Sequence, residues 1–289
     1  MSSFIGCGAR YGGARAVIFG APFDSTASYM PGSRFAPAAL RNESGAIETY
    51  SPYLGRDLED IGVHDMGDLE LPPGDAEAML RAVERRAAEI LKDGKIPVML
   101  GGEHLVTLGA VRAAYEKYPD LRIVHFDAHT DLRDEYLGAK MSHATVIRRC
   151  WDILGDGRIY QFGIRSGTRE EFAWAGGGHT NLRRFDLKGA ETLADALGGA
   201  PVYLTVDLDV LDPGVFPGTG TPEAGGVSYA ELRDALKAAA RCDIVGADMV
   251  ELSPPQDLSG VSTLTACTLL RELLLMAGAS TDGSNELIK

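Results

Sequence analysis

Residues 126–135, FDAHTDLRDE, place four carboxylates and one imidazole directly after the largely apolar residues 121–124. Like charges this close raise one another's pKa, and the end of a buried strand cannot hydrate them all. In an extended segment residues two apart point the same way, so Asp127 and His129 share a face and Asp131 follows on the turn. The segment therefore needs a compensating positive charge.

Acidic and imidazole side chains also follow three other strand-like segments. GGEH ends at His104, DLDVLDP begins with Asp207 and contains Asp209, and Glu251 follows residues 242–250. In sheets of parallel strands, ligands bind beyond the carboxyl ends of the strands. Four strand ends are therefore expected to deliver these side chains to one edge of a sheet.

The charge of this set indicates how many cations it accepts. Its members are four aspartates and two histidines: Asp127, Asp131, Asp207, Asp209, His104 and His129. With neutral imidazoles the formal charge is −4, which two divalent cations cancel and one does not. Carboxylate oxygens with one imidazole per ion favour Mn²⁺-like ions. Two such ions about 3.5–4 Å apart bind water between them and make it hydroxide near neutral pH, which predicts a metal-assisted hydrolase.

Each short pattern also has an ordinary structural interpretation. A single Asp-x-His or Asp-x-Asp is usually a solvated loop or a helix cap, and only the joint placement at strand ends favours metal binding. His125 has the same parity as Asp127, which allows a supporting contact, although a buried core histidine is the preferred interpretation. Asp134 and Glu135 are expected to form a solvated helix start.

The elements that must position these residues alternate along the chain. Continuous apolar runs predict strands at residues 16–20, 95–100, 121–126, 158–163, 201–206 and 242–250. Helical spacing predicts helices at residues 75–92, 105–118, 228–241 and 263–276. This alternation is typical of a doubly wound, three-layer α/β domain, and one domain is expected over residues 1–289. The polar residues 280–289 are expected to fray.

Composition excludes several classes of protein. A net charge of −13 and a pI near 4.9 argue against nucleic-acid and anionic-membrane surfaces and suit a small cationic ligand. The four cysteines are scattered, as in reduced proteins. The first residues lack a signal-peptide pattern, and no apolar run approaches the roughly 18 residues of a membrane span. We therefore expect a soluble cytoplasmic protein.

Motifs spread along the chain resemble those of the ureohydrolase (arginase/agmatinase) family. They are GGEH, DAHTD, SHAT (142–145), DLDVLDP, PGTGTPEAGG (217–226) and VELSPP (250–255), with APFDSTASYMPGSRFAP near the start. Members hydrolyse a guanidino group to urea and an amine using two manganese ions. The resemblance covers nearly the whole chain. It implies a three-layer αβα fold with an eight-stranded, mostly parallel sheet, and a homotrimer or homohexamer.

The resemblance also assigns roles to residues. His104 and Asp131 would ligate one Mn²⁺, His129 and Asp209 the other, and Asp127 and Asp207 both; Asp131 is also counted among the catalytic residues. His143 would shuttle protons to the leaving amine, and Glu251 would hold the guanidinium. Thr221 would contact the substrate. Alternatively, Ser142 and His143 only cap the helix that follows.

The substrate is less firmly indicated than the reaction. Residues 132–135, LRDE, lack the polar pattern with which arginases hold the substrate carboxylate, although Arg133 keeps arginine possible. Glu223 in PGTGTPE and residues 48–61 resemble bacterial agmatinases, so agmatine is the predicted substrate and putrescine the product. Arginine and N1-aminopropylagmatine remain alternatives. An inactive binding protein of this fold is disfavoured, because all six metal-ligand positions have the residues that the family uses. An amide hydrolase with a single zinc ion is also disfavoured, because the residues for a second metal are present.

Overall fold

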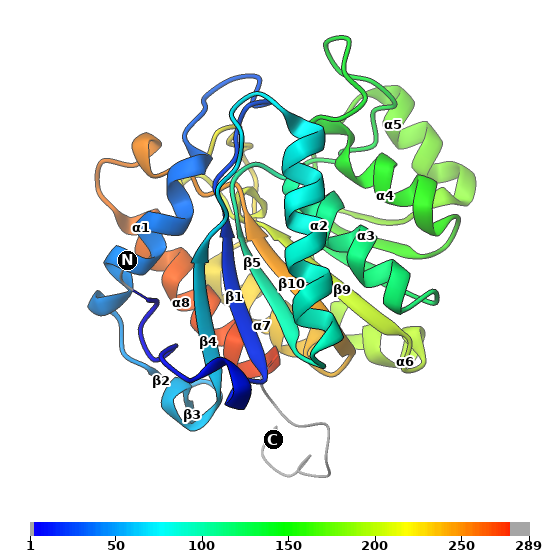
Figure 1. Ribbon diagram of the computed structural model, residues 1–289. Helices are drawn as coiled ribbons and strands as arrows, with labels where there is room; N and C mark the ends of the chain where they lie inside the picture. Colours follow the sequence, from blue (N-terminus) through cyan, green and yellow to red (C-terminus); the bar gives the residue numbers. More distant parts are fainter. Residues whose placement is uncertain (1–2, 278–289) are drawn as a thin grey trace.

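One eight-stranded parallel sheet forms the centre of the protein in the computed structural model, which describes residues 3–277 (Figure 1). The strand order is β4-β1-β5-β10-β9-β6-β7-β8, and each neighbouring pair is parallel. The strands are β1 (Ala16–Ala21), β4 (Val63–Asp68), β5 (Ile96–Gly101), β6 (Arg122–Phe126), β7 (Ile159–Ile164), β8 (Asn181–Arg184), β9 (Pro201–Asp207) and β10 (Asp243–Val250). A separate hairpin pairs β2 (Tyr50–Ser51) with β3 (Arg56–Asp57).

All six strands expected from the sequence are present, each within one residue of its predicted ends. The two additional strands, β4 (VHDMGD) and β8 (NLRR), lie at the edges of the sheet and are largely polar. An edge strand is partly solvated, so it lacks the continuous apolar run that identifies a buried strand.

Helices cover both faces of the sheet. The four predicted helices are α2 (Ala76–Lys92), α3 (Val106–Lys117), α7 (Tyr229–Ala239) and α8 (Val261–Ala277). Shorter helices that the sequence did not predict are α1 (Ala36–Glu43), α5 (Arg169–Trp174) and α6 (Leu193–Leu197), whereas α4 (Val146–Leu154) is the helix expected after Ser142 and His143. Figure 1 shows α2 and α3 in front of the sheet and α7 and α8 behind it. The expected three-layer α/β sandwich is confirmed.

Alternation along each strand divides the core into two parts. In β1, Ile18 faces the cluster that contains residues of α1, α7 and α8, whereas Phe19 faces the cluster that contains residues of α2, α3 and α4. Both side chains are fully buried. Burial of a Phe or Ile side chain contributes about 1.5–3 kcal/mol to folding. The helices on each face of the sheet are therefore held by their own set of buried apolar contacts.

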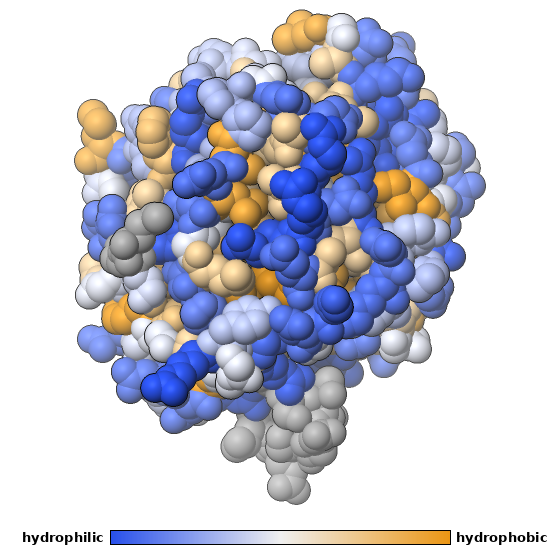
Figure 2. Space-filling model, in the orientation of Figure 1, coloured by the Kyte–Doolittle hydropathy of each residue, from blue (hydrophilic) through white to orange (hydrophobic). Residues whose placement is uncertain are grey.

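The surface agrees with the acidic composition. In the orientation of Figure 1, Figure 2 shows a face dominated by hydrophilic residues, with apolar ones scattered among them. No helix within residues 3–277 is long and apolar enough to cross a membrane. All four cysteines are buried and free of disulfide bonds, as their scattered positions indicated. The predicted fraying of residues 280–289 lies outside the described residues.

The strand order brings the candidate residues together. The strands preceding GGEH, Glu251, DLDVLDP and DAHTD are β5, β10, β9 and β6, which are consecutive neighbours in the sheet. Beyond β5 the backbone at Gly102 passes very close to the loop after β1. A Cβ atom at this position would lie only 1.8 Å from the carbonyl oxygen of Phe23. Only glycine permits this approach, which places His104 against the sheet edge.

Candidate active site

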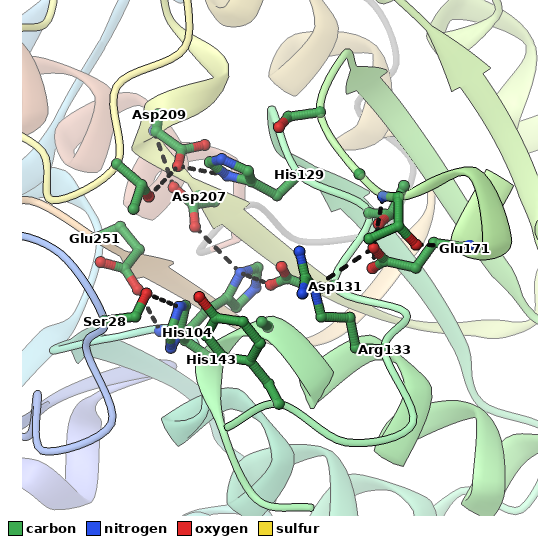
Figure 3. A pocket seen from close by; sticks show the side chains of 17 residues that line it. Ser28, His104, His129, Asp131, Arg133, His143, Glu171, Asp207, Asp209 and Glu251 are labelled. Carbon is green, nitrogen blue, oxygen red and sulfur yellow. Dashed lines mark hydrogen bonds and ion pairs between the residues drawn. The ribbon is translucent and has the colours of Figure 1, made fainter. Parts of the chain in front are cut away.

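A pocket of about 270 Å³ opens at the carboxyl ends of these central strands. Among the residues that line it are His104, His129, Asp131, His143, Asp207, Asp209, Thr221 and Glu251. Asp127 is fully buried and does not line the pocket, but its Oδ2 lies 3.2 Å from Nδ1 of the lining residue His104. The structure therefore brings the residues of the predicted site to one place, although they are up to 147 positions apart in the sequence. Figure 3 shows those that line the pocket.

The carboxylates of Asp127, Asp207 and Asp209 are oriented by backbone N–H groups. The Oδ1 atoms of Asp127 and Asp207 accept hydrogen bonds from the N–H groups two residues later, His129 at 2.5 Å and Asp209 at 2.9 Å. Asp209 Oδ1 accepts from the N–H of Ala128 at 3.1 Å, which connects the loops after β6 and β9. In each case the Oδ2 atom faces an imidazole of the cluster.

His104 stands at the centre of one half of the cluster. Its Nδ1 lies 3.2 Å from Asp127 Oδ2, 3.2 Å from Asp131 Oδ2 and 3.1 Å from Asp207 Oδ2. This nitrogen is buried and makes no hydrogen bond of good geometry within the described residues, while Nε2 contacts Thr205 Oγ1 at 3.0 Å. One ring nitrogen held from behind and the other facing three carboxylate oxygens is the arrangement of a metal-ligating histidine.

The other half of the cluster is centred on His129. Its Nδ1 lies 2.9 Å from Asp209 Oδ2 and 3.5 Å from Asp127 Oδ1. These three residues form one group of ligand atoms close enough to hold a metal ion, and His104, His125 and Asp127 form another. Asp127 is common to both groups, and this set of carboxylate and imidazole donors fits metal ions that prefer oxygen and nitrogen ligands.

The pKa shifts of the buried groups indicate a deficit of positive charge in the cluster. Burial, followed by repulsion from Asp127, raises the pKa of Asp131 to about 7. Burial also raises the pKa of Asp207 well above its usual range. For His104, burial lowers the pKa, but the surrounding carboxylates outweigh it and raise the pKa well above 6.5. Protons therefore compete with cations for these atoms, as expected at a metal site.

Two residues of the cluster adopt left-handed backbone conformations. Asp131 has φ of 52° and Glu251 has φ of 64°, a region that side-chain-bearing residues rarely occupy and that costs of order 1–3 kcal/mol each. The turn at Asp131 directs its carboxylate back toward His104, and Glu251 lines the pocket with its Oε1 accepting from the N–H of His104 at 2.8 Å. Such strain is often found at functional sites.

His143 both begins a helical segment and lines the pocket. Ser142 and Thr145 form a capping box before α4, which confirms the structural interpretation of SHAT, yet the imidazole faces the cavity. Its Nε2 contacts Ser28 Oγ at 3.2 Å and its Nδ1 contacts Ser142 Oγ at 3.2 Å. Burial lowers the pKa of His143 to about 4, so the ring is neutral near pH 7.

Glu103 is a site neighbour that the sequence did not identify. Its carboxylate accepts from the N–H and the hydroxyl of Thr26, at 2.8 and 2.5 Å, and lies 3.7 Å from His143 Nδ1. The hydroxyl of Thr26 in turn accepts from the N–H of His143 at 3.1 Å. Burial raises the pKa of Glu103 to about 7. Its position in the GGEH turn, next to His104, was the available indication.

The PGTGTPE loop closes one wall of the pocket. Thr221 donates from Oγ1 to Asp209 Oδ2 over 3.5 Å, and the side chain of Arg165 donates to the carbonyl oxygens of Asp209 at 2.7 Å and Glu223 at 2.9 Å. Arg165 therefore joins this loop to the turn after β9. The carboxylate of Glu223 accepts from Ser166 at 2.8 Å and lies 3.8 Å from His129 Nε2.

On the other side of the cluster the pocket is bounded by Arg133, Tyr136 and Glu171. The guanidinium of Arg133 lies 4.6 Å from the centre of the Tyr136 ring and its Nε lies 3.6 Å from Glu171 Oε2. Figure 3 shows Glu251 and Arg133 on opposite sides of His104 and Asp131. From the sequence, Arg133 was identified as a residue that could bind a substrate carboxylate, but nothing indicated Tyr136 or Glu171.

The prediction for Asp134 and Glu135 was wrong. Asp134 does not begin a helix, and Glu135 belongs to the same loop; Asp134 instead accepts from Arg149 at 2.7 Å. His125 is buried, as expected, and it also makes the supporting contact that the sequence allowed, because its Nε2 lies 2.7 Å from Asp127 Oδ2. The shared parity of His125 and Asp127 was the correct indication.

Comparison with known proteins agrees with this site. Residues 14–276 match the model of the Arginase family. The agmatinase of Bacillus anthracis is 49% identical over 262 residues, or 90% of each chain. The agmatine ureohydrolase structure of Thermoplasma volcanium superposes with a TM-score of 0.87 at 37% identity, covering 96% of this chain and 94% of that one. The guanidinobutyrase of Pseudomonas aeruginosa is 35% identical over 271 residues, covering 90% and 85%.

The family match and the agmatinase relative, together with the fold and the pocket, define a hydrolase of the ureohydrolase class. More specifically, the chain belongs to the arginase family.

Proposed function

We propose that this enzyme hydrolyses agmatine to putrescine and urea at a site that holds two Mn²⁺ ions. The main support is the convergence of four aspartates and two histidines at one end of the pocket, with Glu251 in its wall. The agmatinase of Bacillus anthracis, with 49% identity, supports agmatine over other guanidines.

The ligands would divide between the ions as the resemblance to the family implies. His104 and Asp131 would hold one ion, His129 and Asp209 the other, and Asp127 and Asp207 both. Such a pair of ions supplies a nucleophile near neutral pH by lowering the pKa of water. His125 is not assigned as a metal ligand, because its two ring nitrogens already contact Asp127 and Gln161.

Glu251 binds the substrate guanidinium. One of its oxygens accepts from the backbone of His104, which fixes the carboxylate next to the metal ligands. Burial and, to a smaller extent, repulsion from Glu103 raise the pKa of Glu251 well above 4.5. This buried acid therefore lacks a compensating positive charge. A guanidinium supplies both charge and N–H donors, and its central carbon is thereby held near the cluster.

His143 moves the proton that releases the amine. The leaving nitrogen must be protonated before the C–N bond breaks. With a pKa of about 4, His143 is neutral near pH 7 and must first accept a proton from the attacking water before it donates one. Contacts with Ser28 and Ser142 hold the ring at the pocket wall during this exchange. Thr221 is proposed to support Asp209 and border the substrate.

A second candidate substrate class is a guanidine with a carboxylate tail. The side chain of Arg133 is 37% exposed and borders the pocket on the side opposite Glu251, where it would attract a carboxylate and repel an ammonium group. Arginine and guanidinobutyrate have such a carboxylate, and the guanidinobutyrase of Pseudomonas aeruginosa is a relative at 35% identity.

The test is one urea assay with four substrates. Mn²⁺-loaded protein is compared on agmatine, arginine, 4-guanidinobutanoate and N1-aminopropylagmatine. We expect kcat/KM for agmatine to exceed each of the others by more than about tenfold, or about 1.4 kcal/mol. A preference for any other guanidine would replace the agmatine assignment, and no urea from all four would refute the proposed activity. The oligomeric state, for which we keep a homotrimer or homohexamer as a prediction, is a separate measurement.

A further inference from the structure

A chain of buried hydrogen bonds connects the edge of the sheet to Asp127. It runs from Thr180 through Gln161 to His125 and then to the carboxylate. His125 lies on β6 and pairs in register with Gln161 on β7, and Thr180 directly precedes β8. His125, Gln161 and Asp127 are fully buried. Thr180, Gln161 and His125 have no role as metal ligands or as acids or bases in the proposed reaction.

The direction of every bond in this chain follows from one carbonyl group. Gln161 Nε2 lies 2.8 Å from the backbone oxygen of Thr130, which can only accept, so this side-chain atom must be the amide nitrogen. The same NH₂ group lies 3.1 Å from His125 Nδ1. A nitrogen that faces an N–H donor must itself be unprotonated.

The proton of His125 is therefore on Nε2. That atom lies 2.7 Å from Asp127 Oδ2 and donates to it. The other oxygen of Asp127 accepts from the N–H of His129 at 2.5 Å, so both oxygens are held and the carboxylate cannot rotate. The hydroxyl of Thr180 completes the chain by donating to Gln161 Oε1 at 3.0 Å.

We infer that His125 and Gln161 are positioning residues that hold the carboxylate of Asp127 in place for cation binding. His125 fixes one oxygen of Asp127, and Gln161, which is itself held by the carbonyl oxygen of Thr130, fixes the orientation of the His125 ring. This inference rests on the proposed role of Asp127 as a metal ligand.

The experiment measures Mn²⁺ binding directly, by electron paramagnetic resonance of free Mn²⁺ during titration of the full chain. In His125→Phe the donor is absent, and we expect Mn²⁺ affinity to fall by about 10–100-fold, because Asp127 is proposed to hold both ions. His125→Gln offers an amide N–H near the position of Nε2 and should recover most of this loss. Gln161→Met removes the donor to Nδ1 and should weaken Mn²⁺ binding by about tenfold.

Ser51→Ala provides the matched control. Ser51 is fully buried and donates to a carboxylate, Glu272, at 2.6 Å, but lies outside the pocket lining. This variant should lose stability and keep the Mn²⁺ affinity of the natural chain. The melting temperature of each variant separates lost folding from lost binding, and His125→Gln and Gln161→Met keep the test available if His125→Phe does not fold.

Unchanged Mn²⁺ affinity in both His125→Phe and Gln161→Met would overturn the inference. Equal losses in His125→Phe and His125→Gln would also overturn it, because a purely steric role would then suffice. If Mn²⁺ binding weakens as expected but the natural chain releases no urea from agmatine, the positioning role stands and the proposed substrate fails.

Discussion

Replacing Glu251 by Gln tests how the pocket binds a guanidinium. The substitution keeps the volume of the side chain and removes its charge. Because Oε1 already accepts from the N–H of His104 at 2.8 Å, Oε2 is the oxygen that remains for the substrate. We therefore count one charge-assisted hydrogen bond rather than a full bidentate pair.

The expected loss follows from that geometry. Removing the charge and turning an amide N–H toward the guanidinium costs about 3 kcal/mol, or roughly 100-fold in kcat/KM for agmatine. Bound Mn²⁺ should be unchanged, since Glu251 is outside the proposed ligand set. The melting temperature should not fall, because the substitution removes a buried charge that lies near Glu103 and Asp209.

Glu272→Gln is the matched control for this prediction. Glu272 is fully buried as well, but its oxygens accept from Arg271 at 2.7 and 3.0 Å and from Ser51 at 2.6 Å, outside the residues that line the pocket. Its charge is paired, so this variant should melt several degrees lower and keep its kcat/KM. Urea release, Mn²⁺ content and melting temperature are measured on both variants. A Glu251→Gln variant that retains kcat/KM within about threefold, or that loses Mn²⁺, would refute the assigned role.

The remaining predictions concern the metal, the substrate tail and acid stability. Asp127→Asn or Asp207→Asn should abolish urea release and reduce bound Mn²⁺ from two ions to at most one; two ions bound with native affinity would disprove bridging. Chelation should remove activity and added Mn²⁺ should restore it, whereas activity that persists without metal would contradict the proposed site. Arg133→Ala should raise the kcat/KM ratio of agmatine to arginine by about tenfold, since it removes a cation near the substrate tail, and an unchanged ratio would exclude that contact. For Asp257, burial raises the pKa, but hydrogen bonds from Ser259 and the first turn of α8 outweigh it and lower the pKa to about 2. This carboxylate therefore stabilises the fold above its unfolded pKa near 3.8, and the contribution disappears as the pH falls through about 2. Asp257→Asn should lose about 1 kcal/mol in denaturant unfolding at pH 7 and progressively less between pH 4 and 2, and a pH-independent loss would contradict this assignment.

Much of the fold could be predicted because burial shapes sequence locally. A central parallel strand is covered on both faces, so β6 and β9 read as continuous apolar runs, and their ends were predicted within one residue. The edge strands β4 and β8 are partly solvated and lack that pattern. The short helices α5 and α6, of six and five residues, have too few turns to show a clear period.

The site followed the same division. Residue type and two-residue spacing were enough to select Asp127, His129, Asp207 and Asp209, because a strand end fixes which side chains share a face. The burial of His125 was predicted, but its hydrogen bonds were not. Parity showed that it could reach Asp127, but only Gln161 from the next strand determines which ring nitrogen has the proton.

The sequence by itself determined the donor atoms, the number of negative charges to be compensated and the class of reaction, because these depend on composition and local spacing. Only the tertiary structure decided that β5, β10, β9 and β6 are neighbours, since strand order depends on how the whole chain packs. It also decided the left-handed backbone at Asp131 and the lowered pKa of His143, because strain and desolvation arise from contacts with distant parts of the chain.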